Sequence, residues 1–384
     1  MGVVETRYAD LPEPLELECG AVLKRVQIAY ETYGTLSPTR DNVILICHAL
    51  SGDAHAAGWS AVPDAPTALD GFKADERGVR QRGGLGWWDG MIGPGKPYDT
   101  DRYFVLSSNL LGGCRGTTGP SSVDSDTGQP YGSRFPVITV GDMVRAERAL
   151  LDILEIPSLL ATAGASLGGM QGLDWAIRFP DMVRGVIAIG ACARLDAQGM
   201  AWNAIARNSI MADADWQGGD YYGTGREPTR GMGIARQLGH VTYLSRQSLR
   251  QKFGRTLQER DDYSYTLRGA DFAVESYLRH QADKFVDRFD ANTYLLFSRA
   301  LTYFDLARVG PVERVRASTL LISFTSDWLY PPEASRELSE LLAGAGKDVE
   351  WHNLETSYGH DSFLLEEAVQ APIISSFLER IYGR

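Results

Sequence analysis

The sequence predicts an α/β fold in which a mostly parallel central sheet is flanked by helices and carries a helical lid insertion. Short, continuous apolar runs alternate with segments of helical spacing, and such runs are typical of strands buried on both faces of a parallel sheet. One long stretch, residues 194–307, breaks this alternation, because it contains helical patterns and no convincing strand. The 384 residues are enough for one large domain with such an insertion.

Five runs are expected to be buried strands, since each is short, aliphatic or β-branched and bounded by polar or glycine residues: Val43–Cys47, Tyr103–Ser107, Leu159–Ala163, Val186–Ile189 and Thr319–Phe324. Val349–His352 is a further strand-like segment. Apolar residues recur at helical spacing in four segments: Val140–Leu154, Met170–Phe179, Pro332–Leu342 and Asp361–Ile381. We therefore expect a core made of residues 1–193 and 308–384, with residues 194–307 as a lid over the carboxyl edge of the sheet.

Charge and hydropathy argue against several classes of protein. The net charge of −11 disfavours nucleic-acid binding, which would require a basic face. No apolar run approaches the length of a membrane span, and the first ten residues are too polar for a secretory signal. We therefore expect a cytoplasmic protein that binds neither nucleic acid nor membranes.

Cysteine and histidine usage predicts no metal site. The four cysteines lie far apart without a Cys-x-x-Cys pair, and the six histidines include no pair at metal-binding spacing. The segment Gly90–Lys96 matches the glycine and lysine spacing of a phosphate-binding loop. However, Pro97 replaces the Ser or Thr that would bind magnesium, and no buried strand precedes the segment. We interpret it as a loop, and we expect neither a metal nor another bound cofactor.

Ser166 stands in a context that is typical of a nucleophile elbow. The apolar run Leu159–Ala163 leads into Gly164-Ala165-Ser166-Leu167-Gly168-Gly169, and a helical segment follows. A G-x-S-x-G turn between a strand and a helix exposes the serine at its tip, and the two outer glycines leave room for neighbouring backbone. The N-terminus of the following helix stabilises developing negative charge. This context predicts an α/β-hydrolase fold in which Ser166 is the nucleophile of an acyl-transfer enzyme.

A serine nucleophile needs a base and an acid that orients the base, and in this fold the acid precedes the histidine in the chain. His360 lies in a loop that directly precedes a helix, whereas His352 lies within a strand-like segment. Asp327 follows a buried strand at its carboxyl end. Ser166, Asp327 and His360 are therefore predicted to form a catalytic triad. Asp361 is next to the histidine, so it points elsewhere and is free for the substrate.

An oxyanion hole requires two backbone N–H groups, one after the nucleophile and one from the loop after an early strand. The run that ends at Cys47 continues into a turn that closes at Gly52. We assign the N–H groups of Leu50 and Leu167 to the hole. His48 lies in the same turn, and we interpret it as a structural loop histidine rather than as a catalytic one.

Six segments beyond the elbow are distinctive: Cys47–Gly52, Gly86–Lys96, Asn109–Pro120, Gly239–Ser245, Lys284–Asn292 and Ser326–Pro332. On these segments the chain resembles, over nearly its whole length, the α/β-hydrolase type of homoserine O-acyltransferase. The resemblance is specifically to the homoserine O-acetyltransferases of methionine biosynthesis. Ala165 departs from the glycine expected before the nucleophile, a small change that should leave the chemistry intact.

The resemblance implies a ping-pong reaction with acetyl-CoA as co-substrate and L-homoserine as acceptor. It also implies that Arg236 binds the substrate carboxylate, that Tyr243 lies near it and that Asp361 binds the amino group. A cation and a carboxylate suit a zwitterion, although Arg236 could instead be a solvated helix charge. The basic stretch 221–260, with eight Lys or Arg and two Asp or Glu, could attract the CoA phosphates. The resemblance further suggests a homodimer that forms through the helical insertion.

Leu329 bears on the choice of acyl donor. In the family that the chain resembles, an arginine two positions after the triad aspartate accompanies succinyl-CoA, and a leucine would leave the distal succinyl carboxylate uncompensated. Acetyl-CoA is therefore favoured. The open alternatives are a homoserine O-succinyltransferase, a serine O-acyltransferase of cysteine biosynthesis, an esterase that uses water, and a non-catalytic binding module.

Overall fold

The computed structural model describes residues 1–60, 73–74, 80–81, 84–267 and 269–383. Its main feature is an eight-stranded sheet with the order β14-β13-β12-β11-β6-β10-β5-β2. The strands are β2 (Arg7–Asp10), β5 (Gln27–Tyr33), β6 (Val43–Cys47), β10 (Phe104–Ser108), β11 (Ala161–Ala165), β12 (Gly185–Ile189), β13 (Ser318–Phe324) and β14 (Val349–Leu354). From β10 to β14 all neighbours are parallel, whereas β5 pairs antiparallel with both β10 and β2.

Three short pairs lie outside this sheet: β1 (Val3–Val4) with β7 (Trp59–Ser60), β3 (Leu15–Glu16) with β4 (Val22–Leu23), and β8 (Lys73–Ala74) with β9 (Arg80–Gln81). The α-helices are α1 (Val140–Ile153), α2 (Leu167–Arg178), α3 (Ala197–Met211), α4 (Thr229–Tyr243), α5 (Arg246–Lys252), α6 (Ala273–Val286), α7 (Ala291–Tyr303), α8 (Leu306–Val309), α9 (Pro332–Gly344), α10 (Ser362–Leu365) and α11 (Glu367–Tyr382). A short 3-10 helix, η4, covers Gly359–Asp361.

The sheet is buried on both faces. Along β6 the side chains alternate between two hydrophobic cores: Val43, Leu45 and Cys47 belong to one core, and Ile44 and Ile46 belong to the other. The first core also contains apolar residues of α1, α2 and α9, and the second contains those of α11. This double burial explains why the predicted strands are continuous apolar runs rather than alternating ones.

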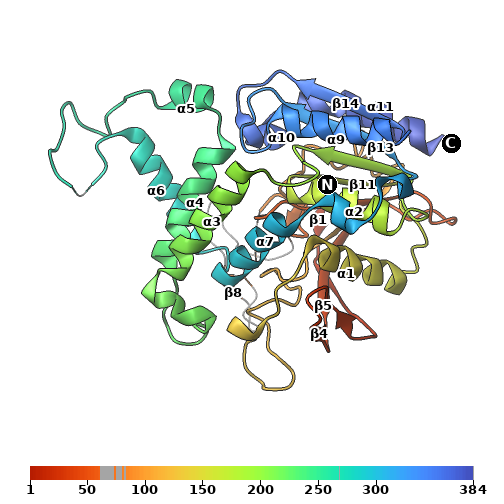
Figure 1. Cartoon of the computed structure of the whole chain (residues 1–384), viewed down its shortest axis with the longest axis horizontal. Coiled ribbons are helices and arrows are strands. Elements are labelled where there is room, and N and C mark those ends of the chain that lie inside the picture. Colours follow the sequence, from red (N-terminus) through yellow and green to blue (C-terminus); the bar gives the residue numbers. More distant parts are fainter. Residues whose placement is uncertain (61–72, 75–79, 82–83, 268, 384) are drawn as a thin grey trace.

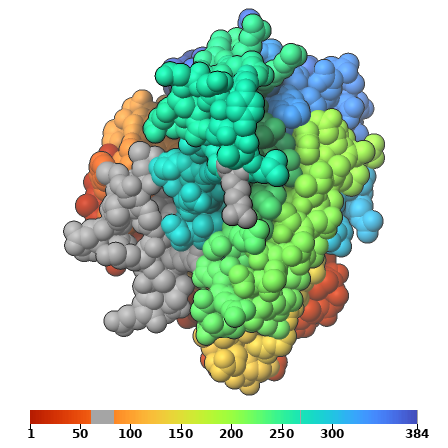
Figure 2. All heavy atoms as spheres, turned by 90° about the vertical axis from the view of Figure 1, so that its left-hand side faces the viewer, coloured from red at the N-terminus to blue at the C-terminus, as the bar shows by residue number. Residues whose placement is uncertain are grey.

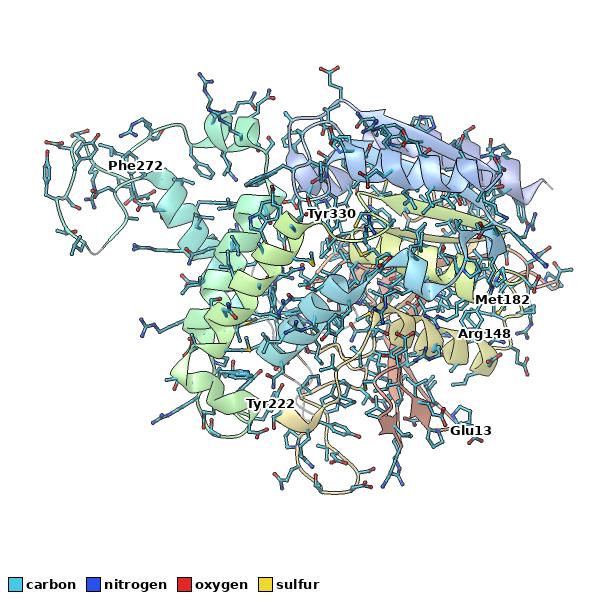
Figure 3. The ribbon with its side chains drawn as sticks, viewed as in Figure 1. Glu13, Arg148, Met182, Tyr222, Phe272 and Tyr330 are labelled. Carbon is cyan, nitrogen blue, oxygen red and sulfur yellow. The ribbon has the colours of Figure 1, made fainter. Side chains whose placement is uncertain are left out.

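The helices α3 to α7 leave the sheet between β12 and β13. The two ends of this segment meet, because the N–H of Leu306 donates to the carbonyl of Ala193 at 2.8 Å and Arg194 forms an isolated β-bridge with Asp305. In Figure 1 the helices α3 to α6 stand to the left of the sheet, and Figure 2 shows them across the face of the molecule on that side. Tyr330, two residues before α9, lies where these helices meet the core (Figure 3).

Beyond small shifts in the ends of elements such as α2 and β14, three differences from the predicted elements stand out. The sequence does not predict β2 and β5, because β5 is interrupted by the polar Glu31, which is nevertheless buried and bonded to Tyr33 and His55. Strand β11 begins two residues later than predicted, since Leu159 forms only a single bridge. The predicted helix from 361 to 381 is broken at Glu366, between α10 and α11.

Glu147 is one of several buried carboxyls that the active-site chemistry does not use. Glu147, on α1, is 3% exposed, and its carboxyl accepts hydrogen bonds from Trp175 Nε1 at 2.7 Å and Ser108 Oγ at 3.5 Å. Burial raises the pKa of Glu147 to about 7, since these bonds offset only part of the cost of removing the charge from water. The native state therefore holds a proton there at pH values at which the unfolded chain has lost it.

We expect the stability of the protein to fall between pH 4.5 and 7 because of Glu147. The unfolded carboxyl ionises near its ordinary pKa of about 4.3 while the folded one stays protonated, so each pH unit in this window costs up to about 1.4 kcal/mol. Above pH 7 the loss is complete. In urea unfolding at several pH values, Glu147→Gln should remove this part of the slope. An unchanged slope in the variant would contradict the assignment.

Candidate active site

Ser166 lies in a strained backbone turn that the close packing of the surrounding residues stabilises. Strand β11 ends at Ala165 and α2 begins at Leu167, and Ser166 between them has φ +56° and ψ −123°. A Cβ added at Gly164 would lie 2.4 Å from the carbonyl oxygen of Cys47, and one added at Gly168 would lie 2.0 Å from the same atom. Both positions therefore require glycine, and the strained serine is held by packing around it.

His360 and Asp327 form a buried pair beside the elbow. Nδ1 of His360 lies 2.7 Å from Oδ2 of Asp327, and both residues are 3% exposed. The other carboxylate oxygen, Oδ1, accepts the N–H groups of Leu329 at 2.9 Å and Tyr330 at 3.0 Å. The carboxylate is thus fixed from two sides and orients the imidazole, which leaves Nε2 as its basic nitrogen.

The imidazole is surrounded by aromatic rings and by one glycine. Its ring centroid lies 5.1 Å from that of Tyr330, 5.7 Å from Phe363 and 6.3 Å from Tyr243. A Cβ on Gly190 would lie 3.1 Å from the imidazole, so this glycine leaves space for the ring. Burial alone would lower the pKa of His360, but the charge and hydrogen bond of Asp327 outweigh it and raise the pKa.

A cavity of about 200 Å³ opens onto Ser166 and His360. Most of the residues predicted from the sequence meet in it. The other lining residues come from the segment between β6 and β10, from the helical insertion, and from η4 and α10, and the lining beyond Ser166 and His360 is Ala49, Leu50, Ser51, Gly52, Trp87, Arg236, Tyr243, Arg288, Asp361, Phe363 and Leu364. Residues far apart in the chain thus reach one pocket, because β6, β11, β13 and β14 end at the same edge of the sheet while α4 covers that edge.

Charged side chains from α4 and η4 line the cavity. Arg236, on α4, packs its guanidinium over the rings of Phe285 at 4.5 Å and Tyr243 at 5.7 Å. Its Nε is buried and has no hydrogen-bond partner among the described residues. Burial raises the pKa of Asp361, although His360 and Arg236 oppose this rise. A cation with an unused donor and a carboxylate therefore face the same small space.

The structure does not bring every predicted residue to the cavity. Leu329 is half-buried against the main core, Leu167 and Asp327 are buried, and the cavity lining among the described residues includes none of the three. Conversely, sequence reasoning missed Arg288 and Trp87 as lining residues. Both lie in segments that carry the resemblance, 284–292 and 86–96, but neither has a local pattern that assigns it to a pocket. Only the fold brings them together.

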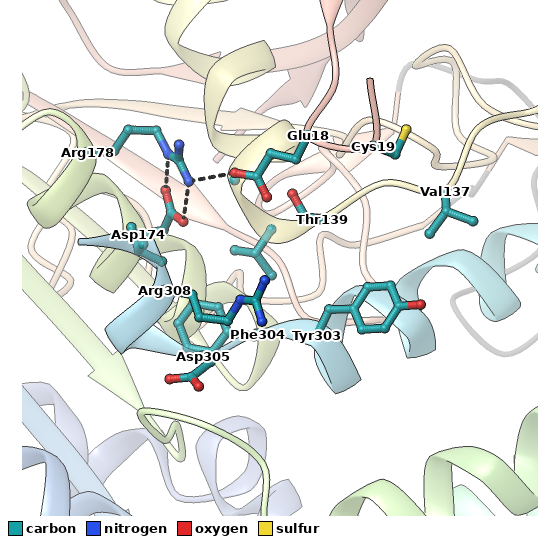
Figure 4. Close-up of a pocket in the computed structure, with 13 residues that line it drawn as sticks. Glu18, Cys19, Val137, Thr139, Asp174, Arg178, Tyr303, Phe304, Asp305 and Arg308 are labelled. Atoms are coloured by element: carbon teal, nitrogen blue, oxygen red, sulfur yellow. Dashed lines mark hydrogen bonds and ion pairs between the residues drawn. The ribbon is translucent and has the colours of Figure 1, made fainter. Parts of the chain in front are cut away.

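A second cavity, of about 460 Å³, lies between the start of α1 and the end of α7, away from Ser166. Figure 4 shows Arg178 between Asp174 and Glu18, to which its guanidinium donates at 2.7 Å and 3.0 Å. These charges satisfy one another and tie the N-terminal segment to α2. The lysine of the phosphate-loop-like segment is also paired, since Lys96 Nζ lies 3.0 Å from Asp89 Oδ2.

Three further observations concern the described residues. They contain no group of three or more His, Cys, Asp or Glu side chains that could hold a metal ion. None of their helices has the length and apolar character needed to cross a membrane. None of the four cysteines forms a disulfide, and Cys19 is exposed whereas the other three are buried.

Comparison with known proteins gives the class and then the family. A family model described as alpha/beta hydrolase fold matches residues 42–367. A homoserine O-acetyltransferase of Methanosalsum zhilinae is 47% identical over 99% of this chain and 74% of its own length. A homoserine O-succinyltransferase of Laribacter hongkongensis is 46% identical over 99% of this chain and 97% of its own. The solved structure of esterase E22 matches with a TM-score of 0.86 and 30% identity, over 98% of this chain and all of that one.

The chain is therefore an α/β hydrolase by fold, which confirms the predicted mostly parallel sheet with flanking helices and a helical insertion. Within that class it belongs to the homoserine O-acetyltransferase family. The prediction of an acyltransferase is thereby confirmed.

From the raised pKa of His360 we predict how the rate of Ser166 acylation depends on pH. A general base acts in its neutral form, so the rate of Ser166 acylation should rise with pH, with a midpoint above the ordinary histidine value of about 6.5. The burst of p-nitrophenol from p-nitrophenyl acetate, followed by stopped flow at a series of pH values, measures this rate. Asp327→Asn should lower both the midpoint and the plateau. A wild-type midpoint below the ordinary value would contradict the assignment.

Proposed function

We propose that this protein transfers the acetyl group of acetyl-CoA to the hydroxyl of L-homoserine through an acyl-Ser166 intermediate, as a step of methionine biosynthesis. The observation that carries the proposal is the shared cavity, in which Ser166 and His360 face Arg236 and Asp361. A nucleophile and its base serve any acyl transfer, but a cation and a carboxylate beside them suit an amino-acid acceptor.

In the first half-reaction, Ser166 Oγ attacks the thioester carbon while His360 Nε2 takes the serine proton. The tetrahedral oxyanion receives the N–H groups of Leu50 and Leu167. Leu167 is the first residue of α2, so its N–H is among those that have no partner within the helix. The carbon–sulfur bond then breaks, and the CoA thiolate leaves with the proton from His360.

In the second half-reaction, His360 takes the proton of the homoserine hydroxyl, and the hydroxyl oxygen attacks the acyl carbon. The bond to Ser166 Oγ breaks, and the serine recovers its proton from the imidazolium. Asp327 stabilises that cation in both halves. His360 must first give its proton to the leaving CoA and then take the proton of the homoserine hydroxyl. The acceptor therefore reacts only after CoA has left, which is the order of a ping-pong reaction.

Arg236 and Asp361 would select the acceptor. A guanidinium binds a carboxylate through two parallel hydrogen bonds, and a buried carboxylate is stabilised by the acceptor's ammonium group. An acceptor that lacks either group leaves a charge of the site unpaired, which is a strong basis for rejection. Tyr243, stacked beside Arg236, keeps that guanidinium in place.

Acetyl rather than succinyl transfer is proposed on the identity of Leu329. The backbone N–H of Leu329 donates a hydrogen bond to Asp327, which places the residue next to the proposed triad. Its side chain carries no positive charge that could pair with a succinyl carboxylate. The likeness to a named succinyltransferase keeps that donor as the second candidate.

The remaining proposals concern the setting of the enzyme. We propose that residues 194–307 act as a lid whose α4 supplies the substrate-binding groups. A homodimer through this insertion would cover exposed apolar side chains of α3 and α4, among them Met200, Ile205 and Ile234, which are 40%, 53% and 54% exposed. We further propose that the protein acts in the cytoplasm, where acyl-CoA is supplied, with acetyl-CoA as a co-substrate and no bound cofactor or metal.

We expect the purified protein to release CoA thiol from acetyl-CoA in repeated turnovers only when L-homoserine is present, because without an acceptor the release stops once Ser166 is acylated. Ser166→Ala should abolish the release in both cases. Thiol release with acetyl-CoA and succinyl-CoA, each paired with homoserine, L-serine or water, separates all the alternatives. Faster turnover with succinyl-CoA would show a succinyltransferase, and faster turnover with serine would show a serine acyltransferase. Continued turnover of the thioester with water alone, at a rate that no added acceptor changes, would show an esterase.

A further inference from the structure

The peptide group between Ala49 and Leu50 has one end in the cavity and the other fixed inside the protein. Its N–H is the one assigned to the oxyanion hole, and both residues line the cavity with Ser166. Its carbonyl oxygen accepts two hydrogen bonds, at 2.7 Å from Nδ1 of His48 and at 2.9 Å from the N–H of Gly52. In a trans peptide the C=O and N–H point in opposite directions. Whatever holds the Ala49 carbonyl therefore also aims the Leu50 N–H.

The other ring nitrogen of His48 determines which atom carries the proton. Nε2 lies 3.2 Å from the backbone nitrogen of Leu110, whose N–H can only donate, so Nε2 must be the accepting nitrogen. The proton of the neutral ring is consequently on Nδ1, where it donates to the Ala49 carbonyl. The ring is fully buried, and burial lowers its pKa, which keeps it neutral.

The surroundings of the ring fix its position. A Cβ on Gly52 would lie 2.8 Å from Cβ of His48, so glycine at that position lets the turn close over the histidine. The backbone of His48 is also held, since Nε2 of the fully buried Gln171 donates to its carbonyl at 3.3 Å and to the carbonyl of Leu167 at 3.1 Å. One side chain thus links the segments that carry both expected oxyanion donors.

We propose that His48 is a positioning residue of the oxyanion hole, which uses Leu110 as its anchor to hold the Ala49–Leu50 peptide with the Leu50 N–H facing Ser166. This inference rests on the proposed acyl-transfer function and deepens it. The proposed role of His48 differs from a general structural role because its two ring nitrogens have separate functions. Nε2 fixes the tautomer, and Nδ1 aims the donor. A hole aligned before the substrate arrives needs no reorganisation during the reaction.

Two substitutions separate the roles of the two nitrogens. Asn places its amide nitrogen near the position of Nδ1, so His48→Asn can still donate to the Ala49 carbonyl. Gln places its amide near the position of Nε2, so His48→Gln can still accept from Leu110 but cannot hold the Ala49 carbonyl. Loss of one oxyanion donor lowers the rate about 100- to 1,000-fold. We therefore expect a loss in this range for His48→Gln and a loss below about tenfold for His48→Asn.

The experiment measures the burst of p-nitrophenol from p-nitrophenyl acetate. The burst amplitude counts folded enzyme with an active Ser166, and the burst rate gives the acylation step for those molecules alone. His55→Gln is the matched control, because His55 is 6% exposed and bonds through both ring nitrogens, to Glu31 and the Gly84 carbonyl. We expect this control to lower the melting temperature and to leave the burst rate unchanged.

Equal losses in His48→Asn and His48→Gln would overturn the proposal, as would a comparable loss in His55→Gln. If His48→Gln does not fold, Gln171→Met tests the same alignment, since it releases the His48 and Leu167 carbonyls together. A burst rate unchanged in Gln171→Met would then overturn it. The burst requires no homoserine, so failure of the proposed acceptor would leave this test intact.

Discussion

The structure of the site depends on the close approach of the nucleophile elbow to the end of strand β6. Gly164 and Gly168 lie so near the carbonyl oxygen of Cys47 that a methyl group at either position would overlap it. This contact places the first turn of α2 beside the loop that follows Cys47. Each of the two segments is expected to give one oxyanion donor, so their separation is set by backbone packing, which cannot adjust without moving the sheet.

The charged side chains around that contact come from two parts of the fold, the core and the helical insertion. Asp327 and His360 follow β13 and β14, and the core fixes them through backbone N–H groups and the ring of Tyr330, while α4 adds only the ring of Tyr243 beside the imidazole. Arg236, by contrast, comes from α4 and stacks on aromatic rings of the insertion. In the proposed function, acyl transfer therefore relies on groups at the sheet edge, and recognition of the acceptor carboxylate relies on the insertion.

Local patterns sufficed to predict the parallel sheet, the elbow and the pairing of Asp327 with His360, because each follows from spacing and chain order. Arg236, Asp361 and Leu329 had no such signal and rested on the resemblance. β5 was missed because its buried Glu31 is stabilised by distant partners, which no local pattern reveals. Arg288 was missed for a related reason, since only the packing of the insertion onto the sheet brings it to the cavity.

The central claim is that Ser166 carries the acyl group between donor and acceptor. Its most direct test is to mix the enzyme with acetyl-CoA in the absence of homoserine, quench in acid and map acetylated peptides by mass spectrometry. The account predicts one acetyl group on Ser166, which disappears when homoserine is added and appears as O-acetylhomoserine. An enzyme that never becomes acetylated, yet forms product when both substrates are present, would contradict it.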